Sequence, residues 1–220
     1  MVQLKFKEGF QNSRLVKSAT LGLFIGGLGM WLVLHGAVQT VLSLEFFQET
    51  HTPVLVTGVQ ELTLTESNPT RLKIPSVGMN TTFRGPLGLE KDGSVSVPDS
   101  YTEIGWYEYG PTPGERGPSV VLGHVDSLTG PAVFYPLKQV EIGDEIFIDR
   151  EDGLTAVFEV FDIENLSQNE FPTERVYGNL AYASLRLITC TGTYDKKVLK
   201  YSHNLIVYAK LVRVASTDHE

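Results

Sequence analysis

Hydrophobic and polar positions divide the chain into two unlike parts. Residues 18–44 contain no Asp, Glu, Lys or Arg. About 20 apolar residues, each rising about 1.5 Å, suffice to cross a bilayer. A secretory signal peptide has a shorter apolar run, followed by a small-residue cleavage site. The pattern therefore predicts one uncleaved transmembrane helix over residues 18–42.

Beyond residue 70, short apolar or β-branched segments alternate with turn sequences. KDG, PTPGERGP and REDG carry the glycine, proline and aspartate that tight turns use. A hairpin is expected around residues 151–153, and short helical turns within residues 131–140 and 172–178. Eight strands predict an all-β domain with short helices, either a closed β-barrel or a sandwich. The expected strands lie within residues 71–78, 81–85, 94–98, 118–125, 144–149, 155–163, 184–190 and 204–212.

The charges beside the apolar run orient it. Four basic residues and one acidic residue precede it, and the first charges after it are Glu45 and Glu49. Because Lys and Arg stay on the cytoplasmic side, we expect a single-pass protein of the cell membrane with its N-terminus inside and its folded domain outside. The expected parts are a cytoplasmic basic tail (1–17), the membrane helix (18–42), a stalk (43–69), the β-domain (70–213) and a C-terminal tail (214–220).

Net charge and residue spacing exclude two classes of partner. The chain has 18 basic and 26 acidic residues, and the part after residue 17 carries a net charge of −11. Such a surface repels phosphate backbones, so nucleic acid is not an expected partner. The five histidines and one cysteine form no HxxxH or CxxC spacing, so we expect no metal site.

Cys190 and His124 are the candidate catalytic residues. Cys190 is the only cysteine and ends the apolar run RLITC. Outside the cell, such a thiol is either a buried core residue or a reactive group. His124 also ends an apolar segment, after Gly123. An imidazole can take the thiol proton and return it to a leaving amine. Core packing is the alternative for each residue alone.

Several segments carry a resemblance to a known family. RLKIPSVGMNTTF, GWYEYGPTPGERGPSVVLGHVDSLTGPAVFYPL, FPTERVYG, LRLITCTGTYD and YSHNLIVYA resemble the sortases, most closely the class F group. The resemblance covers roughly residues 70–212 and implies an eight-stranded sortase β-barrel. It also implies a transpeptidase that cleaves an LPxTG-like sorting signal between Thr and Gly and joins it to a cell-wall or pilin amine. His124 and Cys190 match the family histidine and nucleophile, and no cofactor is implied.

One family residue lacks its usual counterpart. Sortases place an arginine on the strand after the cysteine loop, where it stabilises the oxyanion, but NLIVYA puts Asn204 there. Arg186 lies four residues before Cys190, about 13 Å along a strand and beyond the reach of its side chain. Asn204 can donate two N–H bonds. Asn204 is therefore favoured over Arg186, with Arg175 a lesser candidate. The alternatives are a surface ion pair for Arg186 and a loop contact for Asn204.

Two further residues lie beside this pair in the sequence. Asp126 follows His124 by two positions and either orients the imidazole or stabilises a turn. Thr189 precedes Cys190 and either lines the peptide groove or fills a β-branched strand position.

Two other functions compete with a sortase. L,D-transpeptidases carry their cysteine in an SHGC context, whereas here His203 follows Cys190. A membrane-tethered, sortase-like β-domain that only binds, without turnover, is the second alternative, and the missing arginine favours it. The reactivity of the Cys190 thiol distinguishes this binding domain from a sortase, because a binding domain has no need of an exposed and activated Cys190.

Overall fold

The computed structural model describes residues 61–216. The predicted membrane helix (18–42), the cytoplasmic tail and most of the stalk lie outside the described residues. Between residues 61 and 216 no helix is both long and apolar enough to cross a membrane.

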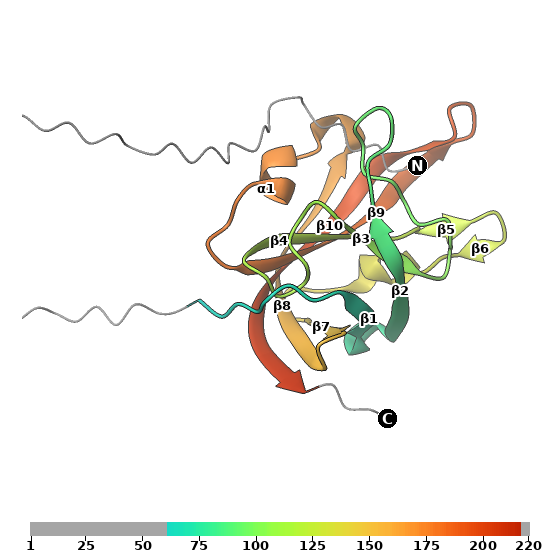
Figure 1. The fold of residues 1–220 in the computed structure, drawn as a ribbon. Helices are drawn as coiled ribbons and strands as arrows, with labels where there is room; N and C mark the ends of the chain where they lie inside the picture. The colour runs from blue at the N-terminus through green and yellow to red at the C-terminus, as the bar shows by residue number, and fades with distance from the viewer. Residues whose placement is uncertain (1–60, 217–220) are drawn as a thin grey trace, which may run out of the picture. The chain divides into compact units, whose positions relative to one another are not determined.

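Eight strands form a closed barrel in the order β1-β2-β3-β4-β9-β10-β8-β7 (Figure 1). The β2–β3 and β4–β9 pairs are parallel, and the other pairs are antiparallel. The barrel strands are β1 (Pro69–Ile74), β2 (Met79–Leu87), β3 (Ile104–Tyr107), β4 (Gly117–Leu122), β7 (Glu145–Arg150), β8 (Leu154–Ser167), β9 (Ala183–Asp195) and β10 (Lys200–Ser216).

Short elements complete the domain outside the barrel wall. Strands β5 (Asp126–Ser127) and β6 (Gly130–Pro131) pair with each other directly after β4. The helix α1 (Thr173–Tyr177) and the 3₁₀ turn η2 (Tyr135–Gln139) lie within the two predicted helical segments. Two further 3₁₀ turns are η1 (Pro75–Val77) and η3 (Gln168–Glu170).

The barrel confirms the predicted fold class and excludes the sandwich, although one predicted strand is wrong. Residues 94–98 make only a single bridge, between Val95 and Leu89. The eighth strand is instead β3, which the sequence pattern did not show. Val95 is 1% exposed because it packs against the outside of the barrel. Its apolar character therefore reflects burial of a loop and not strand pairing.

Two strand connections also bear on the predicted boundaries. The predicted hairpin joins β7 to β8, and Gly153 has φ 78°, a left-handed conformation that glycine adopts without strain. At the C-terminus, β10 continues to Ser216, which pairs with Leu154. The last strand of the barrel therefore runs three residues past residue 213.

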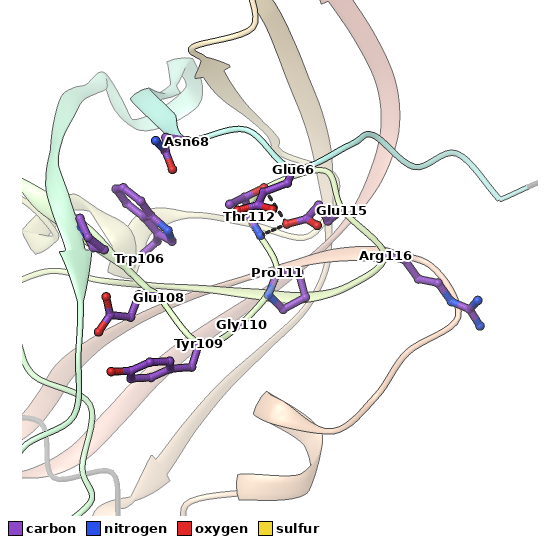
Figure 2. Close-up of a pocket in the computed structure, with 11 residues that line it drawn as sticks. Glu66, Asn68, Trp106, Glu108, Tyr109, Gly110, Pro111, Thr112, Glu115 and Arg116 are labelled. Atoms are coloured by element: carbon purple, nitrogen blue, oxygen red, sulfur yellow. Dashed lines mark hydrogen bonds between the residues drawn. The ribbon is translucent and has the colours of Figure 1, made fainter. Parts of the chain in front are cut away.

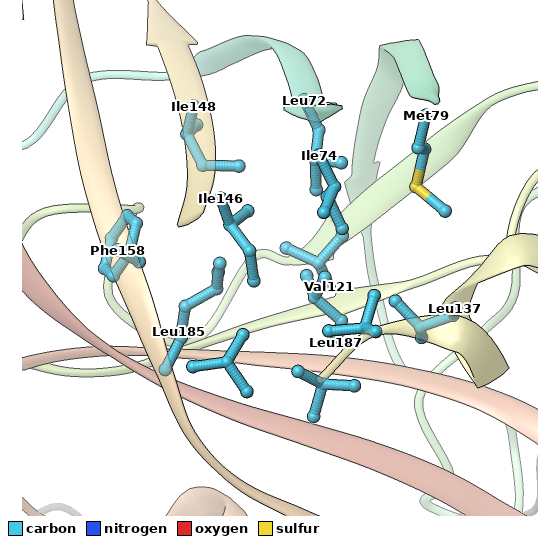
Figure 3. Packing of buried hydrophobic residues seen from close by; sticks show 14 of the residues in the cluster. Leu72, Ile74, Met79, Val121, Leu137, Ile146, Ile148, Phe158, Leu185 and Leu187 are labelled. Carbon is cyan, nitrogen blue, oxygen red and sulfur yellow. The ribbon is translucent and has the colours of Figure 1, made fainter. Parts of the chain in front are cut away.

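Buried side chains form two clusters, one on each side of the barrel wall. The interior cluster receives residues from all eight strands, including Val121, Leu185 and Leu187 (Figure 3). The outer cluster contains Cys190 and also Val176 of α1. The first part of β9, from Ala183 to Cys190, is buried on both faces. Because successive residues of a strand face opposite sides, its odd-numbered residues point inward and its even-numbered residues outward. Cys190 is thus held on the outer face of a rigid wall.

Candidate active site

The parallel pairing of β4 with β9 places His124 beside Cys190. The ladder runs from Gly117 opposite Ala183 to Leu122 opposite Ile188. At the same offset, His124 comes level with Cys190, two residues past the last pair. Neighbouring strands lie about 4.8 Å apart. By the alternation of side chains along each strand, both residues belong to the outward-facing side of the barrel wall. The structure therefore brings the two predicted catalytic residues to one level of the barrel wall.

Thr189 holds the two strands together at this level. Its hydroxyl donates to the carbonyl oxygen of Gly123 at 2.8 Å. The side chain is 1% exposed, which is the environment expected of the strand-filling alternative. It instead extends the register of β4 and β9 by one residue, directly before His124 and Cys190.

The hydrogen bond of the His124 ring determines which of its two nitrogens carries the proton. Its Nε2 lies 2.8 Å from the carbonyl oxygen of Pro98. A carbonyl only accepts, so Nε2 carries the proton and Nδ1 of the neutral ring is the basic nitrogen. The Tyr101 ring packs on the imidazole with 4.7 Å between ring centroids. Pro98 and Tyr101 therefore hold the ring in one orientation, and sequence patterns did not point to either residue.

Burial keeps the Cys190 thiol protonated. The residue is 6% exposed, and this burial, with the negative charge of Asp126, raises the pKa of the thiol above its usual value. A raised pKa lowers the thiolate fraction at neutral pH. A protonated thiol becomes a nucleophile when a base accepts its proton, and the Nδ1 of a neutral imidazole is such a base.

We expect alkylation of Cys190 by iodoacetamide to be slow at pH 7 and to accelerate through and beyond pH 8.5, the usual thiol pKa being about 8.5. The reason is the raised pKa, which moves the rise in thiolate to higher pH. Intact-mass measurement of the labelling rate between pH 6 and pH 10 checks this, with free cysteine as the reference thiol. A rate that levels off below about pH 8 contradicts it.

Asn204 lies directly opposite Cys190 on β10. Such cross-strand partners have Cβ atoms about 4.5–5.5 Å apart. Asn204 is 1% exposed, and neither its Nδ2 nor its Oδ1 has a hydrogen-bond partner among the described residues. Burying an amide without partners costs about 1–3 kcal/mol. The structure therefore places an uncompensated donor group next to the sulfur, and the loop contact considered from the sequence is not made.

Arg186 is turned away from Cys190. Its guanidinium donates to Ser184 and to the carbonyl oxygen of Leu185 at 3.0 Å, toward the start of β9. It also stacks on the Tyr208 ring, 4.7 Å from the centroid. Arg186 is 2% exposed, and this burial lowers its pKa to about 10. The surface ion pair considered as its alternative role is absent from the described contacts. Arg186 instead packs on Tyr208 of the outer cluster.

Arg175 is engaged elsewhere on the barrel wall. It projects from α1 and forms ion pairs with Asp162 and Glu164 on β8. Its guanidinium lies 4.2 Å from the Tyr208 ring centroid. Tyr208 pairs with Arg186 and not with Cys190, so Arg175 is likewise held four residues away from the thiol along β9.

Asp126 contacts Tyr201 across the site. The Tyr201 hydroxyl donates to Asp126 Oδ2. Burial and this hydrogen bond raise the pKa of Tyr201, so the phenol stays protonated. Within residues 61–216 the hydrogen bond of the His124 ring goes to Pro98 and not to Asp126. The sequence offered no signal for Tyr201, because its partner lies 75 positions away.

A separate hollow of about 510 Å³ lies beside the segment between β3 and β4 (Figure 2). Trp106 and Tyr109 supply aromatic surface, and Glu115 is tied to the Thr112 hydroxyl at 2.8 Å. None of the predicted site residues lines this hollow. Across residues 61–216 no three His, Cys, Asp or Glu side chains gather into a metal-binding group.

Comparison with known proteins assigns this architecture. Residues 72–212 match the family described as "Sortase domain". No curated protein matches the chain. Sortase C-1 from Actinomyces oris is 26% identical, with a TM-score of 0.51 over 66% of this chain and 71% of that one.

Two more distant structures share the fold. Sortase A from Listeria monocytogenes is 15% identical, with a TM-score of 0.52 over 70% of this chain and 93% of that one. A lid mutant of sortase A from Corynebacterium diphtheriae is 20% identical, with a TM-score of 0.52 over 68% of this chain and 73% of that one. At these identities the likeness establishes the eight-stranded barrel and no finer property.

Proposed function

The chain belongs to the sortase family, and we propose that it is a cysteine transpeptidase that cleaves an LPxTG-like sorting signal between Thr and Gly. The acyl group then passes to an amine of the cell wall or of a pilin subunit. The observation that carries this proposal is that β4 and β9 bring His124 level with Cys190. The hydrogen bond of the His124 ring uses Nε2, and its basic nitrogen, Nδ1, has no partner among the described residues. Nucleophile and base are the two groups that covalent acyl transfer requires.

In the first step the Cys190 sulfur attacks the Thr carbonyl carbon while His124 Nδ1 takes the thiol proton. The C–N bond to glycine then breaks, and His124 returns this proton to the departing amine. In the second step the acceptor amine attacks the thioester, and the C–S bond breaks. A neutral acceptor amine loses one proton, which passes through His124 to the sulfur. No cofactor takes part.

Asn204 serves as the oxyanion donor in this proposal. Each step places a negative charge on the carbonyl oxygen next to Cys190, and Asn204 lies directly across from that residue. An amide donor without a competing partner is ready to bond an oxygen whose charge grows during the reaction. Arg186 already donates to Ser184 and Leu185, which supports Asn204 for this role.

The location and subclass of the enzyme are also proposals. The charge-free run over residues 18–42 and the basic residues before it support a single-pass membrane protein with its catalytic domain outside the cell. The motifs GHVDS and LITCTG support the class F group.

The experiment incubates the full-length protein with a labelled LPxTG peptide and then adds an amine acceptor. We expect an adduct on the peptide that contains Cys190, with the mass of the acyl fragment, and its conversion to a new amide once the amine is present. Hydroxylamine should release the adduct, as expected for a thioester. An unmodified Cys190 after long incubation with a panel of LPxTG-like peptides contradicts the proposal.

The alternative is a sortase-like binding domain with weak turnover. Two observations favour it: Cys190 is only 6% exposed, and a neutral asparagine stands in place of the usual arginine. The same experiment decides between the two, because a binding domain retains the labelled peptide without forming an adduct on Cys190.

A further inference from the structure

The hydrogen bond between Tyr201 and Asp126 spans the strand that carries Cys190. Asp126 lies in β5, just beyond β4, and Tyr201 lies in β10. The strand order β4-β9-β10 places β9 between them. Tyr201 packs against the outer cluster that contains Cys190. A carboxylate and a phenol therefore meet over the end of β9, on the same side of the barrel wall as the nucleophile.

The surroundings of Asp126 suit a positively charged group. The Tyr201 and Tyr194 rings lie 5.1 Å apart by centroid, and Tyr194 is 42% exposed. Asp126 is partly exposed, and within residues 61–216 no lysine or arginine forms an ion pair with it. A partly exposed carboxylate is a favourable partner for an ammonium ion. The exposed Tyr194 ring, which packs on Tyr201, offers an aromatic face that attracts a cation as well.

The negative charge of Asp126 also reaches the sulfur. After burial, it is the cause that raises the pKa of the Cys190 thiol, and Cys190 in turn contributes to the raised pKa of Tyr201. Both effects require Asp126 and Tyr201 to lie close to the nucleophile. A cation held by the carboxylate would therefore be near the thioester carbon.

We propose that Asp126, together with Tyr201 and Tyr194, binds the ammonium group of the acceptor amine beside Cys190. We call these three residues the ammonium subsite. The inference rests on the proposed transpeptidase function and adds that the second substrate, the acceptor amine, binds as a cation. Primary amines are mostly protonated at neutral pH, so an acceptor arrives as a cation and must lose a proton before it attacks. Of the two protons that this nitrogen loses in all, one reaches the sulfur through His124 and the other passes to water.

The subsite predicts a specific defect in Asp126→Asn. We expect the concentration of triglycine amide that gives half-maximal transfer to rise about tenfold, since a charge-assisted contact typically contributes that much. Transfer to hydroxylamine, which is uncharged at neutral pH, should stay at the parent level. This concentration is obtained from the ratio of transfer to hydrolysis, measured with the full-length enzyme at increasing acceptor concentration. The ratio does not depend on how fast the thioester forms.

Two matched variants complete the design. Asp126→Glu keeps the charge and should retain most of the preference for the cationic acceptor. Asp195→Asn removes one negative charge from the exposed end of β9, where Asp195 accepts from the Lys197 backbone, and should leave the ratio unchanged. Comparable expression and melting temperature of the Asp126 variants show that they are folded.

The outcomes separate this inference from the proposed function. A parent enzyme that forms no Cys190 adduct refutes the function, and the subsite with it. If the adduct forms but Asp126→Asn transfers to triglycine amide at the parent concentration, the subsite alone is refuted. An equal loss with triglycine amide and hydroxylamine also refutes it and assigns Asp126 to orienting His124.

Discussion

Replacing Cys190 by alanine is expected to abolish peptide cleavage and transfer, and His124→Gln to lower kcat by about 10²–10⁴. The first change removes the atom that holds the acyl group, so no covalent route remains. The second leaves a thiol that is still protonated at neutral pH, because burial and Asp126 raise its pKa. Initial rates of peptide cleavage by the full-length protein measure both effects.

The double variant tests whether the two residues act as a unit. If His124 works only through the Cys190 thiol, adding His124→Gln to Cys190→Ala has no further effect on the residual rate. Additive losses contradict this, as does a Cys190→Ala variant that cleaves peptide at the parent rate. Thr129→Ala is a suitable control, because Thr129 is exposed and hydrogen-bonds only to Ser127 among the described residues.

Replacing Asn204 by alanine is expected to lower kcat by about 10²–10³ while KM for the peptide changes little. The donor contacts an oxygen that becomes negatively charged only in the transition state, so ground-state binding does not depend on it. Steady-state kinetics over a range of peptide concentrations separate the two parameters. A rise in KM at constant kcat contradicts the assignment.

Stability gives this prediction an independent readout. Asn204 is buried with both polar side-chain atoms unpartnered among the described residues. Alanine removes the cost of burying an amide without hydrogen-bond partners, so we expect Asn204→Ala to melt at the same temperature as the parent or higher. A residue that stabilises the barrel would show the opposite change in melting temperature.

Arg186→Ala is the comparison variant, and we expect it to lose stability while it keeps its activity. Arg186 donates to Ser184 and Leu185 and stacks on Tyr208. Its loss removes buried contacts, at a cost of about 1–3 kcal/mol of folding free energy. The folded variant should retain nearly the parent kcat. Lost turnover in a folded Arg186→Ala, with Asn204→Ala active, would assign the oxyanion role to Arg186.

The strands that the sequence predicted correctly are those with a local signal. Residues 184–190 and 204–212 are mostly apolar because β9 from Ala183 to Cys190 and β10 from Asn204 to Ala209 are buried on both faces. The hairpin at residues 151–153 was marked by aspartate and glycine in a tight turn. Residues 94–98 carry the same kind of signal without forming a barrel strand, because Val95 is buried against the outer cluster. Apolar patterns report burial, and only tertiary structure decides what buries the residue.

Local sequence and family motifs identified His124, Cys190 and Asn204 as candidates, because each lies in a segment with its own recognisable pattern. Their arrangement depends on the pairing of β4 with β9, whose paired residues, such as Leu122 and Ile188, are 66 positions apart in the sequence. Only the tertiary structure decided that Arg186 turns away from the thiol and that Asp126 meets Tyr201 over β9. The physical reason is that side-chain direction and cross-strand neighbours follow from register, and register forms only when distant segments close the barrel.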